Sequence, residues 1–99
     1  MSEKVVYKED TKIEFKKPKM YKIILLNDDY STMEFVVEVL VKVFHKSVAD
    51  ATQIMLDVHQ KGKGIVGAYT YDIASTKIAQ VEQMAAERDF PLAAVMEPE

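Results

Sequence analysis

Three consecutive polar residues, Asn27, Asp28 and Asp29, form the group in this chain best suited to hold a cation. Two adjacent carboxylates and an amide carbonyl are hydrogen-bond acceptors, and together they attract either a metal ion or an ammonium group. A simpler interpretation is a turn, because Asn and Asp side chains often hydrogen-bond to their own backbone. The residue types alone leave both interpretations open.

The segments on either side of these residues predict two rigid elements. Residues 23–26 are all bulky and apolar, which is typical of a buried strand. Ser31, followed by Glu34 three positions later, matches the capping box that begins a helix, with Ser31 as the N-cap. We therefore expect the polar residues in a short loop between a strand and a helix, a setting that often supports function.

A second group of candidates lies on the second predicted helix. The spacing of Met55, Val58 and His59 puts these residues on one helical face. His59 comes just before the end of that helix, where the helix dipole favours a histidine that is simply on the surface. Met55 and Val58 are equally typical of an ordinary core. The spacing does not decide between these roles and a binding site.

The composition excludes several classes of function. The 99 residues carry a net charge of −3 and a sequence pI of about 5.4, so we do not expect nucleic acid as the main partner. There is no Cys, and only His45 and His59 offer nitrogen ligands, so we expect no disulfide, no metal and no cofactor. No apolar run is long enough to cross a bilayer, and the lack of Cys fits a cytoplasmic protein.

The length and the charge pattern predict one domain behind an N-terminal extension. Residues 1–17 are charged, mixed in sign and poor in apolar side chains, so we expect a flexible arm there. The alternation at 13–15 leaves an edge strand possible within that arm. The folded domain is then expected at residues 18–99.

Hydrophobic periodicity predicts an α+β fold with the order β-α-α-β-α-β. Such a chain forms a small three-stranded antiparallel sheet with three helices packed on one face, behind a flexible N-terminal arm. The expected strands lie at 20–26, 64–69 and 92–96, and the expected helices lie at 32–45, 47–61 and from 70 or 72 to 88.

The segment PKMYKIILLNDDYSTMEFV at 18–36 resembles the signature of the bacterial ClpS adaptors. The similarity continues through ATQIMLDVHQKGK at 51–63 and resumes at 76–77 and 90–92, so it covers essentially everything from residue 18 onward. Two positions depart from the pattern: Thr32 stands where the best-known members have Pro, and Ser31 stands where many have Thr. Both departures concern fine selectivity.

The resemblance implies an adaptor of the N-degron pathway, which is not an enzyme. Such proteins bind a substrate's N-terminal Leu, Phe, Tyr or Trp and pass the substrate to the N-terminal domain of the ClpA unfoldase. They thereby modulate the specificity of the cytoplasmic ClpAP protease. The same resemblance implies an α/β fold related to the C-terminal domain of the ribosomal stalk protein.

The resemblance also implies roles for individual residues. Asn27, Asp28 and His59 would hold the substrate's α-ammonium group, and Asp29 would assist at the peptide backbone. The unfoldase interface would include Asp72 and Lys77. The hydrophobic pocket for the first side chain would be lined by Ser31, Met33, Val36, Met55, Val58 and Leu92.

Two other hypotheses remain open on the sequence. The first is a hydrolase or metal enzyme that uses Asp28, Asp29 and His59. The chain contains no nucleophile elbow, P-loop or metalloprotease motif, and the loop offers fewer oxygens than a magnesium or calcium site needs. The second is a ribosome-associated protein-interaction module that shares the fold, because a fold alone does not fix function.

Overall fold

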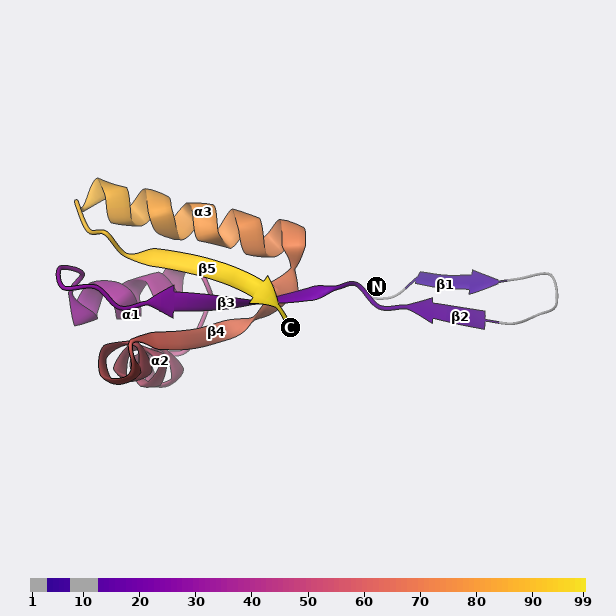
Figure 1. Cartoon of the computed structure of the whole chain (residues 1–99), viewed down its shortest axis with the longest axis horizontal. Coiled ribbons are helices and arrows are strands. Elements are labelled where there is room, and N and C mark those ends of the chain that lie inside the picture. The colour runs from indigo at the N-terminus through magenta and orange to yellow at the C-terminus, as the bar shows by residue number, and fades with distance from the viewer. Residues whose placement is uncertain (1–3, 8–12) are drawn as a thin grey trace.

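A computed structural model describes the backbone of residues 4–7 and 13–99 and the side chains from residue 17 onward. From the third strand onward its order is β-α-α-β-α-β, so the predicted α+β class is confirmed. Along the chain the elements are β1 (Lys4–Tyr7), β2 (Ile13–Lys16), β3 (Met20–Leu26), α1 (Met33–Lys42), α2 (Val48–Lys61), β4 (Lys63–Thr70), α3 (Tyr71–Glu87) and β5 (Ala93–Pro98), as labelled in Figure 1.

Strand β3 lies at the centre of the three-stranded antiparallel sheet, which has the order β4-β3-β5. Leu26, the last residue of β3, pairs with Lys63 on one side and with Ala93 on the other. The chain therefore leaves the sheet from a position that is fixed by both neighbouring strands.

A bulge interrupts the pairing of β3 with β4. Ile23 pairs with Gly67 while Ile24 pairs with Ile65, so Val66 is the extra residue. A Cβ atom at Gly67 would lie only 3.1 Å from the hydroxyl of Tyr69. A glycine within a strand is typical of a bulge or of a close approach, and Gly67 shows both.

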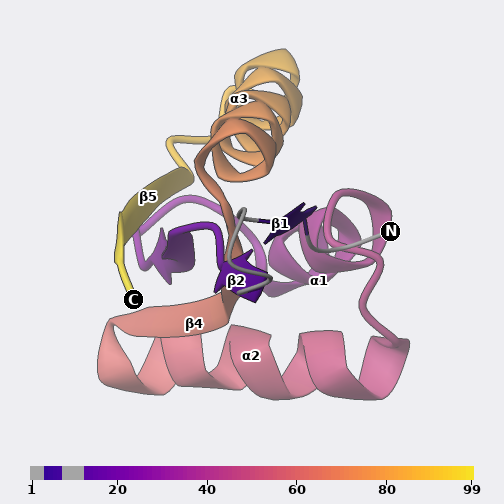
Figure 2. The ribbon, with the colours of Figure 1, turned by 90° about the vertical axis from the view of Figure 1, so that its right-hand side faces the viewer.

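The three helices and the sheet share one core. Ile23 and Leu25 are fully buried on the same face of β3, and they belong to one cluster with the buried residues of all three helices. Figures 1 and 2 show α1 behind β3, α2 beside β4 and α3 along β5. Burial of one apolar face by each helix stabilises this arrangement.

Local signals place the ends of α2 as predicted. The Ser47 side chain accepts a hydrogen bond from the backbone N–H of Asp50 at 3.1 Å, so Ser47 is the N-cap. Gly62 ends the helix in the left-handed conformation, with a φ of 88°. Helix α1 differs from the prediction, because it ends at Lys42 and His45 has a positive φ of 57°.

The N-cap of α1 is Thr32, so the capping-box assignment of Ser31 was wrong by one residue. The Thr32 hydroxyl accepts from the backbone N–H of Phe35 at 3.1 Å. Ser31 instead donates its backbone N–H to the Asp28 carboxylate. Two neighbouring hydroxyl residues compete for the cap, and the tie to Asp28 leaves Ser31 in the loop.

The N-terminal segment contains a hairpin in which β1 pairs antiparallel with β2, from Lys4 opposite Lys16 to Tyr7 opposite Ile13. The alternation at 13–15 made a strand possible there, and the structure contains that strand as β2. Figure 1 shows this hairpin projecting from one end of the domain. Residues 1–3 and 8–12 lie outside the described residues, so the predicted flexibility of residues 1–17 stays a prediction.

Candidate functional site

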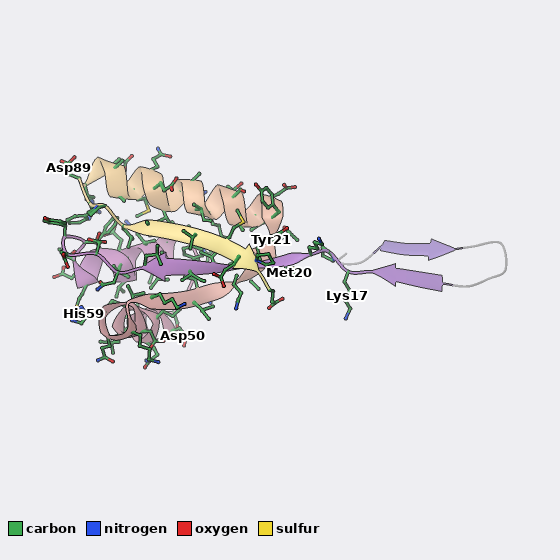
Figure 3. The ribbon with its side chains drawn as sticks, viewed as in Figure 1. Lys17, Met20, Tyr21, Asp50, His59 and Asp89 are labelled. Atoms are coloured by element: carbon green, nitrogen blue, oxygen red, sulfur yellow. The ribbon has the colours of Figure 1, made fainter. Side chains whose placement is uncertain are left out.

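The polar loop after β3 is joined to the end of α2 by a backbone hydrogen bond. The N–H of Asn27 donates to the carbonyl oxygen of Gly62 at 2.9 Å, and the N–H of Gly62 closes the helix by donating to Val58. Figure 3 shows His59 at the same end of the domain as the tip of β3, away from the N-terminal hairpin. Chain segments that are far apart in sequence therefore meet at one end of the domain.

Asp28 is the most constrained member of the loop. One carboxylate oxygen, Oδ1, accepts from the backbone N–H of Tyr30 at 2.8 Å and from that of Ser31 at 2.6 Å. Burial raises the pKa of this carboxyl group, but the Ser31 and Tyr30 hydrogen bonds outweigh burial and leave the pKa below its ordinary value. Asp28 is therefore an oriented anion at neutral pH.

The second oxygen of Asp28 has a different environment. Within the part of the chain that the structure describes, Asp28 Oδ2 and the Ser31 hydroxyl are buried and neither takes part in a hydrogen bond of good geometry, although the Ser31 side chain lies near enough to help lower the Asp28 pKa. An unpartnered buried carboxylate oxygen is costly, so native proteins seldom leave one without a role. The arrangement fits a donor supplied by a bound molecule.

The other polar candidates are open to solvent. Asn27 and Asp29 are exposed on either side of the half-buried Asp28 in the chain, and His59 is exposed in the last turn of α2. This arrangement gives the loop one fixed acceptor with further acceptors at its rim. A small cationic group with several N–H donors matches such a set.

The apolar candidates fall into two groups. Met33 is exposed at the first position of α1, and Ser31 is half-buried beside it. The remaining four are buried in the core cluster, so the core interpretation of Met55 and Val58 is correct as far as their packing goes. These four are Val36, Met55, Val58 and Leu92.

Lys77 and Asp72 lie on α3, and the two side chains have different environments. Asp72 is exposed in the first turn of the helix. Lys77 is half-buried, and its ammonium donates to the carbonyl oxygen of Val43 at 2.7 Å. The same ammonium lies 5.7 Å from the ring centroids of both Phe44 and Tyr69. Sequence reasoning did not anticipate this contact between α3 and the end of α1.

Gly64 is a second feature that sequence reasoning missed. A Cβ atom at this position would lie 2.8 Å from Val58 Cγ2 and 3.1 Å from the carbonyl oxygen of Ile54. Because glycine has no Cβ atom, α2 can pack closely on β4 at this position. A glycine just after the helix-ending Gly62 was the available signal for such a close approach.

A metal centre finds no support in the described part of the chain, where no three His, Cys, Asp or Glu side chains lie close enough to hold an ion. Nor does any helix among the described residues have the length and apolar character to cross a membrane. The fold and the loop define a small α+β domain with a fixed carboxylate in the loop that follows its central strand.

Comparison with known proteins identifies the family of this module. The sequence model of the family described as "ATP-dependent Clp protease adaptor protein ClpS" matches residues 16–95. A ClpS adapter protein from Acetivibrio thermocellus is 75% identical over 99 residues, covering 100% of both chains. One from Syntrophus aciditrophicus is 60% identical over 80 residues, covering 81% of this chain and 75% of its own.

A solved structure agrees with this assignment. Agrobacterium tumefaciens ClpS2 bound to L-phenylalaninamide matches with a TM-score of 0.80 and 41% identity, covering 84% of this chain and 100% of that chain. The chain belongs to the ClpS family of ATP-dependent Clp protease adaptors. It is therefore an adaptor protein and not an enzyme, which confirms the expectation from the sequence.

Proposed function

We propose that this adaptor binds the N-terminal Leu, Phe, Tyr or Trp of N-degron substrates and delivers them to the ClpA unfoldase for degradation by ClpAP. The observation that carries the proposal is the buried, unpartnered Oδ2 of Asp28, whose carboxylate is already oriented through Oδ1. A substrate's α-ammonium group supplies the missing donor.

The α-ammonium group distinguishes a chain's first residue from every internal residue. It carries one positive charge and three N–H donors, so recognition needs several acceptors in fixed positions. Asp28 Oδ2, the Asn27 side-chain carbonyl and a neutral nitrogen of His59 are the three acceptors we assign to it. Asp29 lies next along the loop, where the peptide backbone would leave the site.

The first side chain of the substrate requires an apolar pocket. We assign its walls to Val36, Met55, Val58 and Leu92, which are buried, with Met33 and Ser31 at the rim. Methionine has a flexible, polarizable side chain that adapts to both aliphatic and aromatic groups. The Agrobacterium tumefaciens relative binds L-phenylalaninamide, a ligand with a free amino group and a benzyl side chain, and this supports the assignment.

Delivery requires a second surface, which we assign to Asp72 and Lys77 of α3 as the contact with the N-terminal domain of ClpA. Helix α3 begins at the end of the domain from which the N-terminal hairpin projects, and there the rings of Tyr21 and Tyr71 meet with centroids 5.5 Å apart. The candidate peptide site lies at the opposite end of the domain. Substrate and unfoldase could then be held at once, in the cytoplasm where we propose that the adaptor works.

The decisive experiment compares two peptides that differ only at the N-terminus. One has a free α-amine on Leu or Phe, and the other is acetylated, which removes the charge and leaves one donor. The buried, ionised Oδ2 of Asp28 then loses its charged donor, at roughly 1–3 kcal/mol or more, and the exposed acceptors Asn27 and His59 lose theirs at a smaller cost. Fluorescence anisotropy should show binding weakened about a hundredfold or more.

Variants test which groups read the amine. Asp28→Ala and His59→Ala should each weaken the free-amine peptide and should have little effect on the acetylated one. Asp50→Ala is the matched control and should bind both peptides like the parent. It removes an exposed carboxylate from the first turn of α2, at the other end of the helix from His59. Affinity should also fall as the pH rises past the α-amino pKa of about 8. Equal affinity for free and acetylated peptides would refute the amine-reading mechanism.

A further inference from the structure

The oxidisable sulfur of this chain is held entirely by methionine, since the sequence has six Met and no Cys. Among the described methionines, Met33 is 46% exposed and Met55 is 9% exposed. Met20, Met84 and Met96 are half-buried. Among the described methionines, an oxidant in solution should therefore reach Met33 first, because methionine oxidation follows exposure.

Met33 is held close to the candidate ammonium site by short-range contacts. It is the first residue of α1, directly after the N-cap Thr32, whose hydroxyl is bonded to Phe35. The residue before the cap, Ser31, is tied to the Asp28 carboxylate through its backbone N–H. The position of Met33 is therefore coupled to that of the carboxylate, while its side chain remains open to solvent.

We propose that Met33 is an oxidation site through which peroxide weakens the binding of N-terminal residues. This inference rests on the proposed function, in which Met33 forms the pocket rim. In the reaction, the thioether sulfur attacks one peroxide oxygen and the O–O bond breaks. The sulfur is oxidised to a sulfoxide with one new S–O bond, and hydrogen peroxide is reduced to water.

The sulfoxide changes the chemistry of one wall of the pocket. A flexible apolar side chain becomes polar, and a bound Leu or Phe side chain would cover the new S–O group without supplying a donor. Covering a polar group without a hydrogen bond costs enough to weaken binding about tenfold or more. Met55 is buried, so its thioether is protected from the same oxidant.

The test is a graded hydrogen peroxide titration of the full chain. Peptide mass mapping follows the oxygen added at each methionine, and anisotropy follows binding of a free-amine Leu or Phe peptide. We expect Met33 to oxidise before Met20, Met55, Met84 and Met96, and the affinity to fall in step with the fraction of Met33 sulfoxide. Treatment with a methionine sulfoxide reductase and a dithiol should remove the oxygen and restore the affinity.

Two variants separate Met33 from the other methionines, each protein being compared with its own untreated form. Met33→Leu keeps an apolar side chain of similar size without sulfur, so peroxide should change its affinity little. Met84→Leu retains Met33 and should lose affinity as the parent does. An equal loss in Met33→Leu, or an unchanged affinity in the parent after Met33 is oxidised, would overturn the proposal.

The failure of the proposed function has a different signature. If the untreated protein bound free and acetylated peptides equally, the adaptor mechanism would fail and the functional part of this inference with it. If the untreated protein discriminated the two peptides but peroxide modified Met20, Met84 or Met96 before Met33, only the oxidation proposal would fall. The two measurements are made on the same samples.

Discussion

A mutation of Lys77 tests whether this residue, which we assign to the unfoldase interface, stabilises the fold. Its ammonium is hydrogen-bonded to Val43, the C-cap of α1, and lies over the rings of Phe44 and Tyr69. A cation at the C-terminus of a helix also interacts favourably with the helix dipole. We expect Lys77→Met, which keeps an unbranched apolar stem, to lose all of these interactions.

The magnitude follows from those contacts. A hydrogen bond from a charged donor contributes roughly 1.5–3 kcal/mol, and each cation–π contact contributes roughly 0.5–1 kcal/mol where water has access. Lys77 is half-buried, so we take the lower part of the combined range. The free energy of unfolding should then fall by about 2.5 kcal/mol, measured by urea denaturation with an unchanged m value.

Lys42→Met is the matched control for this measurement. Lys42 lies in the last turn of α1 and pairs with Glu38, but its side chain is 65% exposed, so its loss should cost at most about 0.5 kcal/mol. If Lys77→Met were no more destabilising than Lys42→Met, the anchor at Val43 would contribute nothing. Asp72→Ala should leave stability unchanged while weakening binding to the ClpA N-terminal domain, which separates a direct contact from the fold.

Three further predictions concern the pocket, the arm and the loop. Met33→Ala should bind peptides that begin with Ile or Val, because it removes the side chain that would clash with a β-branched first residue. If anisotropy showed that the variant and the parent both fail to bind those peptides, Met33 would not be the residue that excludes them. Deleting residues 1–17 should leave peptide affinity nearly unchanged and slow degradation by ClpAP, whereas a large loss of affinity would place the arm in the pocket. The folded-state pKa of Asp28 is lowered, so its contribution to stability should be complete above the ordinary pKa of 3.8 and lost as the pH falls through the folded value. Acid denaturation of the parent and of Asp28→Asn should therefore converge at low pH, and parallel curves would contradict the assignment.

Sequence reasoning succeeded where the signal was local. Ser47 and Gly62 fix the two ends of α2, because a hydroxyl cap and a left-handed glycine act within a few residues. The same reasoning extended α1 too far. Val43 and Phe44 continue the apolar periodicity and are buried, yet the helix ends at Lys42. The buried apolar residues continue from α1 into the loop that follows it. The spacing of apolar residues alone cannot distinguish a helix from a loop that packs on the same core.

Contacts between distant segments could not be predicted from the sequence. The bond from Lys77 to Val43 joins residues separated by 34 positions. Nor could the sequence single out one member of the polar loop, because Asn27, Asp28 and Asp29 are adjacent and chemically alike. Only the three-dimensional arrangement makes Asp28 half-buried while leaving its two neighbours exposed.

In the proposed function, the turn and the cation site are two functions of a single carboxylate. Asp28 Oδ1 holds the loop through Tyr30 and Ser31, and Oδ2 remains free for a ligand. Asp28→Asn should separate these functions, since its amide oxygen can still accept from both N–H groups while its NH₂ replaces Oδ2. That donor would face the substrate's ammonium, so the variant should lose peptide binding at least as fully as Asp28→Ala.

Stability should follow the opposite order, with Asp28→Asn closer to the parent than Asp28→Ala at neutral pH, because only the alanine variant loses the loop acceptor. Urea denaturation and anisotropy on the same three proteins measure both quantities. If Asp28→Asn bound the free-amine peptide like the parent, the oxygen left open in the loop would not be the one that reads the amine. If both variants were equally destabilised, the loop would depend on the charge of Asp28 and not on its hydrogen bonds.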